Sequence, residues 1–264
     1  MKKILANYKK AIIIFISFFI ISRLVTIILF FTIDYNSFLS DSSYSFALSD
    51  VIYSIIMLII IAYFDKKNKT VNKTDLSYDK NYSFLLLLIL GSILFRVCID
   101  PIIRLDEILN ISNLPAEDQR INKTVYENIF IFLDVVLLAP IIEEIVFRGY
   151  ILNALNKIKF NSKILLSSLL FTLIHVPLEL TSLIPVFILG VILGYIAMRF
   201  KLIYAIIFHA LYNLIWFIID FNSNDYWDLI SSLNFRYTYW GLVLICLSAF
   251  LLVFKKIHHK KSPI

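Results

Sequence analysis

Two adjacent glutamates and an arginine four residues after the second are the first residues in this sequence that could do chemistry. Glu143, Glu144 and Arg148 lie in the otherwise apolar run 141–149. On a helix, Glu144 and Arg148 share a face and can form an ion pair, in which the arginine could hold the carboxylate with two hydrogen bonds. The residue four positions after Glu143 is the uncharged Phe147, so this carboxylate has no such partner and is suited to act as general base or acid. The alternative is a structural ion pair plus one glutamate that reaches toward the helix end.

Two histidines and an asparagine lie in later apolar segments. His175 follows four residues after Phe171 and is followed by Pro177, and His209 lies four residues before Asn213. Residues four apart share one face of a helix. An asparagine amide there can donate to a developing oxyanion, or it can join two membrane helices. A lone histidine in an apolar helix is more often a packing residue than a catalyst.

The rest of the chain is too apolar for a water-soluble protein. Hydrophobic residues make up 60% of its 264 residues and charged residues 17%, against about 45–50% and 25% in soluble domains. This composition excludes a disordered chain, a disulfide scaffold and a soluble enzyme, and both cysteines, Cys98 and Cys246, lie in apolar runs. The apolar content suffices for roughly eight spans of about 20 residues. Few glycines and prolines and no sustained period-two pattern favour helices, so we predict an all-α polytopic membrane protein.

Eight segments are apolar enough to be spans. We predict transmembrane helices at residues 11–33, 46–64, 83–99, 125–152, 163–180, 182–200, 202–220 and 235–254. Of the 25 basic residues, 18 lie in one set of alternate loops and ends and four in the other set. Such a bias marks the cytoplasmic side, so we expect both termini in the cytoplasm. The net charge of +6 is therefore interpreted as a topology signal rather than a nucleic-acid signal, and the basic C-terminal tail is expected to contact anionic lipid headgroups.

These spans place the polar residues at similar depths. Counted at about 1.5 Å per residue from the cytoplasmic helix ends, Glu143 and His175 lie roughly 18–21 Å into the membrane. The same count gives about 18 Å for Asn213 and about 12 Å for His209. Pro140, and a second proline after His175, would free backbone carbonyls, which is tolerated where the backbone lines a cavity. We interpret the coincidence of a carboxylate, two imidazoles and an amide from three helices as one shared site.

In this order, the three motifs resemble those of the CPBP family of intramembrane proteases (CAAX-processing and bacteriocin-processing proteases, also called the Abi family). The resemblance covers about residues 135–215 and rests on Glu-Glu-x-x-x-Arg, Phe-x-x-x-His and His-x-x-x-Asn. Gly190 and Gly194 are similar to the family's glycine pair between the second and third motifs, which we interpret as packing residues. We divide the single membrane domain into N-terminal helices and an outer loop (1–124), a catalytic core (125–220), and a last span with a basic tail (221–264).

The resemblance implies an intramembrane endopeptidase that hydrolyses a peptide or membrane-protein substrate near the cytoplasmic leaflet. Glu143 and His175 would activate a water for attack on the peptide carbonyl. His209 and Asn213 would stabilise the resulting oxyanion. The abundance of Ile, Lys, Asn and Phe is typical of an AT-rich bacterial genome, so we expect a multi-pass protein of a bacterial cell membrane. The sequence indicates neither the substrate's identity nor the oligomeric state.

The resemblance also implies that Glu144 and Arg148 support the site. No cofactor is required by this reading, although Glu143, His175 and His209 could ligate Zn²⁺ with a water in the fourth position. No His-Glu-x-x-His motif is present, and a glutamate-activated water needs no metal. The alternative function is a non-catalytic membrane regulator or bacteriocin-immunity protein that uses the same pocket for binding. A proton-coupled transporter is a weaker alternative because no internal repeat is found.

Two further charged residues are expected to pair. Arg96 and Asp134 lie at matching depths in the outer halves of the third and fourth predicted spans. Ionisable residues inside a membrane usually pair with one another, so we predict an ion pair between them. Arg23 lies near the middle of the first span and has no obvious partner in the sequence.

Overall fold

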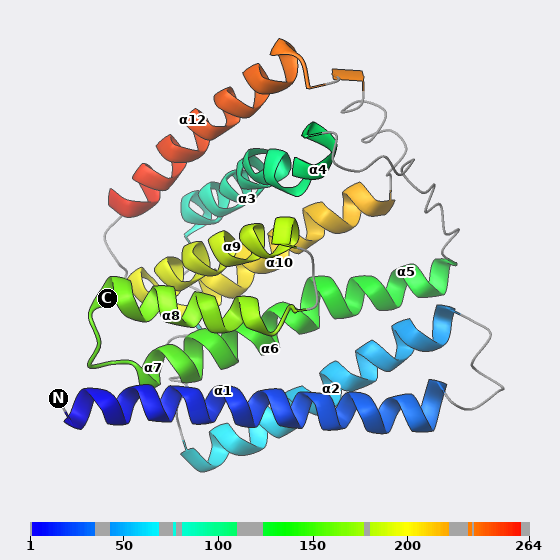
Figure 1. Ribbon diagram of the computed structural model, residues 1–264, viewed down its shortest axis with the longest axis vertical. Helices are drawn as coiled ribbons and strands as arrows, with labels where there is room; N and C mark the ends of the chain where they lie inside the picture. The colour runs from blue at the N-terminus through cyan, green and yellow to red at the C-terminus, as the bar shows by residue number, and fades with distance from the viewer. Residues whose placement is uncertain are drawn as a thin grey trace.

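The computed structural model describes residues 2–34, 43–68, 76–77, 81–109, 124–176, 180–221, 232–233 and 235–259. Helices make up nearly all of these residues, and no β-strand occurs among them, which confirms the all-α class. Successive long helices run in opposite directions (Figure 1), and helices far apart in the sequence, such as α3 and α12, pack against one another.

Each predicted span overlaps a helix of the structure, and the ends of the helices differ from the predicted ends. They are α1 (Lys2–Leu29) with its continuation η1 (Phe30–Asp34), α2 (Ser43–Asn68), α3 (Tyr82–Ile103), the short α4 (Leu105–Ile108), α8 (Phe160–Leu173), α9 (Leu180–Arg199), α10 (Leu202–Phe221) and α12 (Tyr237–His259). Five helices in the described part of the chain are long and apolar enough to cross a membrane by length and composition. The helix α8 ends seven residues earlier than predicted for its span, at Leu173, because the residue before a proline is disfavoured in helical conformation and Pro177 follows closely.

The fourth predicted span is one continuous helix of five named segments. They are α5 (Val125–Ile131), the π-helical η3 (Phe132–Leu138), α6 (Ala139–Glu144), the π-helical η4 (Ile145–Ile151) and α7 (Leu152–Ala154). At the end of η3, the Ala139 N–H donates to the Asp134 carbonyl five residues back. The next bond in this pattern would run from residue 140 to the Val135 carbonyl, but Pro140 has no N–H to donate. The proline therefore leaves the Val135 carbonyl without its helical partner.

Two apolar cores hold the bundle together. One joins α3, α9, α10 and α12 and contains Leu88, Leu193 and Phe208, whose side chains are almost completely buried. The other joins α1, α2, α8 and the helix of α6 and η4, and contains Phe147 and Phe171. Because Phe208 precedes His209, and Phe147 and Phe171 belong to the first two motifs, the motif residues lie where the two cores meet.

Many apolar side chains on the outside of the bundle are exposed. Ile245 and Leu251 on α12, for example, are 69% and 58% exposed, and α1 has a similar apolar outer surface. A water-soluble protein rarely exposes such extended apolar surfaces, whereas lipid chains cover them in a membrane. The exposed surface therefore supports a multi-pass membrane protein.

The predicted pair between Arg96 and Asp134 is wrong. Arg96 instead pairs with Asp100 on its own helix, with 3.1 Å between Nη1 and Oδ1. The Asp134 carboxylate accepts a hydrogen bond from the Ser54 hydroxyl of α2. The reason is helix packing, since α3 lies against α9, α10 and α12, whereas η3 lies against α2 and α10.

Candidate active site

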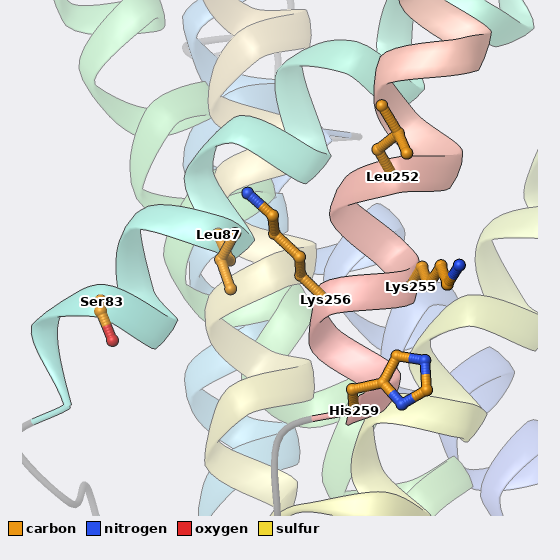
Figure 2. A pocket seen from close by; sticks show the side chains of 6 residues that line it. All are labelled: Ser83, Leu87, Leu252, Lys255, Lys256 and His259. Atoms are coloured by element: carbon orange, nitrogen blue, oxygen red, sulfur yellow. The ribbon is translucent and has the colours of Figure 1, made fainter.

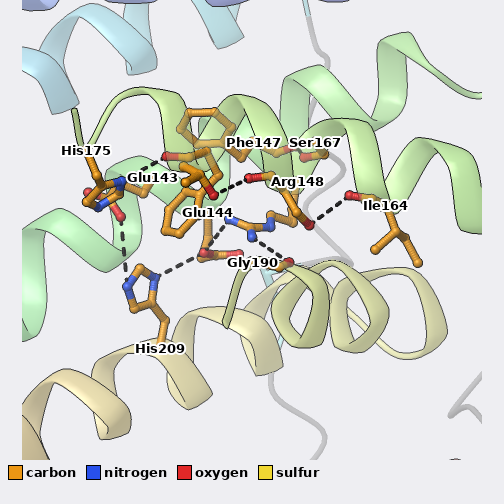
Figure 3. A network of polar contacts seen from close by, with 12 residues as sticks. Glu143, Glu144, Phe147, Arg148, Ile164, Ser167, His175, Gly190 and His209 are labelled. Atoms are coloured by element: carbon orange, nitrogen blue, oxygen red, sulfur yellow. Dashed lines mark hydrogen bonds and ion pairs between the residues drawn. The ribbon is translucent and has the colours of Figure 1, made fainter. Parts of the chain in front are cut away.

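The predicted ion pair of the first motif is present. Arg148 Nη1 lies 2.8 Å from Glu144 Oε1, and both side chains are completely buried. The arginine holds one carboxylate oxygen rather than both, because its Nη2 donates to the Gly190 carbonyl of α9 over 2.9 Å. Arg148 thereby links the helix of the first motif to α9 by a hydrogen bond (Figure 3).

The two glycines of α9 allow this close approach. A Cβ atom on Gly190 would lie 3.1 Å from Ser168 Cβ and 3.3 Å from Phe171 Cδ1 of α8, and one on Gly194 would lie 3.1 Å from Ile164 Cγ2. These distances are shorter than ordinary side-chain contacts, so any larger residue would push α9 away from α8. The interpretation of the glycine pair as packing residues is confirmed. Gly190 also presents its carbonyl to Arg148.

His209 of α10 lies between the two glutamates. Its Nδ1 is 3.1 Å from Glu144 Oε1, and its Nε2 is 3.8 Å from Glu143 Oε2. The Glu144 oxygen already accepts from Arg148, and a carboxylate can only accept, so Nδ1 of the histidine is the donor. The ring orientation is therefore fixed by Glu144, and Nε2 is directed toward Glu143 (Figure 3).

The two glutamates differ in accessibility. The side chain of Glu143 is 19% exposed, whereas that of Glu144 is completely buried. Adjacent residues on a helix point about 100° apart, so one carboxylate can face the bundle interior while the other faces a space that water or a substrate can reach. Glu143 is therefore the more accessible of the two carboxylates, and Glu144 is the one bound by Arg148 and His209.

His175 lies just beyond the last residue of α8. Its Nδ1 is 2.8 Å from the Phe171 carbonyl, which can only accept, so this nitrogen donates and Nε2 keeps its lone pair. The Phe171 ring is central to the site, because its centroid lies 4.8 Å from that of His175 and 5.9 Å from that of His209. The Arg148 guanidinium lies over the same ring, 4.6 Å from its centroid. One aromatic ring thus contacts residues of all three motifs.

Asn213 links α10 to the π-helical segment. Its Nδ2 donates over 2.8 Å to the carbonyl of Val135, the carbonyl that Pro140 leaves without a helical partner. The expectation that a proline would free a carbonyl near the site is thus met at residue 135. An asparagine amide has two N–H donors, and this bond uses one of them.

The same region matches a known protein family. Residues 125–215 match the model described as type II CAAX prenyl endopeptidase Rce1-like. Residues 125–215 are called the Rce1-like domain below, after the model to which they are similar. It begins where α5 begins and includes all three motifs. No curated protein and no solved structure matches the chain significantly.

Within the described residues, the Rce1-like domain contains no group of three His, Cys, Asp or Glu side chains placed to share a metal ion. In the alternative zinc set, His209 Nε2 lies 3.8 Å from Glu143 Oε2, and the Nδ1 of His175 is hydrogen-bonded to the Phe171 carbonyl. The described side chains therefore do not form a ready-made set of zinc ligands.

Three contributors to the Rce1-like site were not assigned a role from sequence. They are the Phe171 ring, the Gly190 carbonyl and the Val135 carbonyl. The aromatic residue was visible as part of its motif, four residues before His175, but its contact with His209 depends on how α8 and α10 pack. The two carbonyls carry no side-chain signal, and only Pro140 pointed toward one of them.

Proposed function

We propose that the protein is an endopeptidase that cleaves a peptide or membrane-protein substrate within the membrane, using a water activated by Glu143 and His175. The observation that carries this proposal is the partly exposed Glu143 carboxylate next to the buried, hydrogen-bonded Glu144–His209 pair in the Rce1-like domain. A site of this kind has one group free to react and another fixed to orient its neighbours.

In the proposed first step, Glu143 takes one proton from a water molecule, while the O–H that remains on the water donates a hydrogen bond to His175 Nε2. Holding the water in this way positions its oxygen to attack the peptide carbonyl. The carbonyl carbon gains the hydroxyl and its oxygen becomes an oxyanion. Glu143 then returns its proton to the amide nitrogen as the C–N bond breaks, which balances the reaction. No cofactor takes part in this scheme.

The oxyanion would be stabilised by His209 and Asn213. With both ring nitrogens protonated, His209 donates from Nδ1 to Glu144 and offers its Nε2–H to the oxyanion. Asn213 offers the amide hydrogen that is not engaged with Val135. Preorganised donors of this kind typically contribute 10²–10³-fold each to turnover. Glu144 and Arg148 act as positioning residues, because they hold the imidazole and α9 but are shielded from solvent.

We place the enzyme in a bacterial cell membrane, with its basic helix ends in the cytoplasm and the cleavage site in the inner half of the bilayer. The supporting pattern is the concentration of lysines at one set of helix ends, which matches the positive-inside rule. Eight spans fit the alternating course of the described helices (Figure 1). A substrate that contacts Glu143 must therefore present a peptide bond below the cytoplasmic surface.

The test compares cells that produce wild type, Glu143→Gln or Asp65→Asn, with peptide termini in the membrane proteome quantified by mass spectrometry. Asp65 is a matched control, since it is an acid in the last turns of α2 and forms a hydrogen bond with Tyr150, which is not one of the motif residues. We expect new termini with wild type and the control but not with Glu143→Gln. Identical patterns in all three strains would contradict the proposal. Cleavage of the identified substrate by purified protein with and without a chelator then tests metal dependence.

One observation favours the non-catalytic alternative. Asn213 is already used to join two helices, which is the structural role that an asparagine in a membrane helix usually has. If Glu143→Gln and His175→Ala both fold normally and retain full function in cells, the pocket is a binding site of a regulator or immunity protein. If either change abolishes function while the protein still accumulates in the membrane, the peptidase reading is supported.

A further inference from the structure

We propose that a groove between the first turn of α3 and the last turns of α12 binds one anionic phospholipid. The groove has a volume of about 600 Å³ (Figure 2). It is lined by Ser83, Leu87, Leu252, Lys255, Lys256 and His259. None of these residues belongs to the three motifs, so this is a site separate from the proposed peptidase site.

The polar part of the groove suits a phosphate group. Lys255, Lys256 and His259 are exposed in the last turns of α12. Lys256 extends toward Leu87 and α3, whereas Lys255 points to the other side of α12 (Figure 2). No acidic residue is among the six that line the groove. The groove also lies at the beginning of α3, a helix of 22 residues, with Ser83 in its first turn. The N-terminal end of a helix carries partial positive charge and favours anions. Because the Asn81 side chain already accepts from the Phe84 N–H and the Ser83 hydroxyl at this helix end, the positive charge of the groove comes chiefly from its lysines.

The apolar part of the groove distinguishes a lipid from a free anion. Leu87 and Leu252 lie next to the charged residues, and Leu252 is 63% exposed. A soluble phosphate compound would leave both leucines in contact with water. A phospholipid instead covers them with its acyl chain while its headgroup lies at the lysines, so the mixed lining favours a lipid.

The basic end of α12 is held in place rather than free to move. Ile257 and Val253 are buried against the core that α12 shares with α3. His258 forms a hydrogen bond through Nδ1 with the Tyr195 hydroxyl of α9 and stacks on its ring. These contacts fix the turn that carries Lys255 and Lys256, which reduces the entropy lost when a headgroup binds.

The groove also lies at the correct depth for a headgroup. Figure 1 shows the last turn of α12, the first turn of α3 and the first turns of α1 at the same end of the bundle. This is the end of the bundle at which most lysines lie. Each lysine near an anionic membrane surface strengthens binding to anionic lipid roughly fivefold. The inferred ligand is therefore an anionic phospholipid of the leaflet at this end.

The experiment measures binding of phosphatidylglycerol to the purified full-length protein in neutral detergent by native mass spectrometry, with phosphatidylcholine of the same chains for comparison. We expect one phosphatidylglycerol to bind preferentially to wild type. The double variant Lys255→Gln/Lys256→Gln should weaken its affinity roughly 25-fold, from two lysines at about fivefold each. The matched control is Lys9→Gln/Lys10→Gln, which removes the same charge from exposed positions near the beginning of α1 and should change affinity less than about threefold.

A third variant tests the apolar part. Leu252→Trp fills the groove without changing its charge, and we expect it to weaken phosphatidylglycerol binding at least tenfold while its melting temperature without lipid stays at the wild-type value. If both lysine variants weaken phosphatidylglycerol binding equally, the proposal is overturned, because the lipid then responds to the overall surface charge and not to this groove. Equal binding of phosphatidylcholine would also overturn it, as would competition by glycerol phosphate at the concentration at which phosphatidylglycerol binds, which would indicate a site for a soluble phosphate.

Discussion

Two regions of this bundle contain a buried ion pair with the same spacing, and they differ in what surrounds it. In the Rce1-like domain, Glu144 and Arg148 lie 2.8 Å apart with both side chains fully buried. In α3, Arg96 and Asp100 lie 3.1 Å apart with side chains 4% and 3% exposed. Both pairs join residues four apart on one helix, so neither spacing nor burial separates them.

The two ion pairs differ in the residues that surround them. The Glu144 carboxylate also accepts from His209, and the adjacent residue is the partly exposed Glu143. Asp100 accepts from the Tyr239 hydroxyl of α12, and its neighbours in sequence are Ile99 and Pro101. A buried ion pair is therefore a means of holding helices in both regions. Only the first region places an accessible acid and an oriented imidazole next to the pair.

The largest expected effect comes from removing the accessible acid. Glu143→Gln should lower turnover about 10³-fold, since a general base typically contributes 10²–10⁴-fold, while the free energy of unfolding changes by less than about 1 kcal/mol. Turnover on the identified substrate and thermal melting measure the two effects. Asp100→Asn, the matched change in α3, should leave turnover per folded molecule unchanged. Wild-type turnover of Glu143→Gln would remove the distinction between the two regions.

Breaking either ion pair should destabilise the protein by similar amounts. Arg148→Met and Arg96→Met each leave a buried carboxylate without its guanidinium, which costs about 3–5 kcal/mol. We expect both variants to melt at clearly lower temperature, but only Arg148→Met to reduce turnover per folded molecule, because it releases Glu144 and with it His209. A matching loss of turnover in Arg96→Met would show that the α3 region also supports catalysis.

The glycines offer a smaller test of the same comparison. Gly190→Ala places a methyl group 3.1 Å from Ser168 Cβ and should destabilise the protein by about 1–3 kcal/mol and lower turnover. Gly91→Ala in α3 places its methyl at ordinary distances, 3.4 Å from the nearest atom of Phe208, and should be neutral or stabilising by up to about 1 kcal/mol. Equal effects in melting experiments would contradict the close approach of α8 and α9.

The smallest expected effect comes from the hydrogen bond between Tyr239 of α12 and the Asp100 carboxylate of α3. Tyr239→Phe removes the hydroxyl that donates to Asp100 over 3.0 Å but keeps the ring, so it should cost about 1 kcal/mol and leave turnover unchanged. Unfolding by heat at fixed detergent concentration measures the first effect. A loss above about 3 kcal/mol would show that the hydroxyl, and not only Arg96, holds the buried carboxylate.

What the sequence predicted correctly was local. The positions of the long helices followed from apolar runs, and the Glu144–Arg148 pair followed from a spacing of four, because both depend only on local sequence and helix geometry. The same spacing was available for Arg96 and Asp100, but matching depths favoured Asp134 instead, and depth says nothing about which helices are neighbours. Two groups at one depth in a bundle can lie on opposite sides of it.

What the sequence could not predict depends on packing between distant segments. The contact between His209 and Glu144 joins residues 65 apart, and no local pattern specifies it. The exposed fraction of Glu143 likewise depends on what the neighbouring helices leave uncovered. The π-helical turn before Pro140 shifts the hydrogen-bond pattern by one residue, so the freed carbonyl is that of Val135 rather than the one expected for a regular helix.

The bond between Asn213 and that carbonyl has a mechanical consequence. Asn213 lies one helical turn from His209, and Val135 lies eight residues from Glu143, so the bond ties together the two helices that supply these groups. A slide of α10 by a single residue would move the amide about 1.5 Å along the helix axis and break the bond. The bond therefore opposes sliding of α10 along the neighbouring helix and so keeps His209 and Glu143 at a fixed spacing.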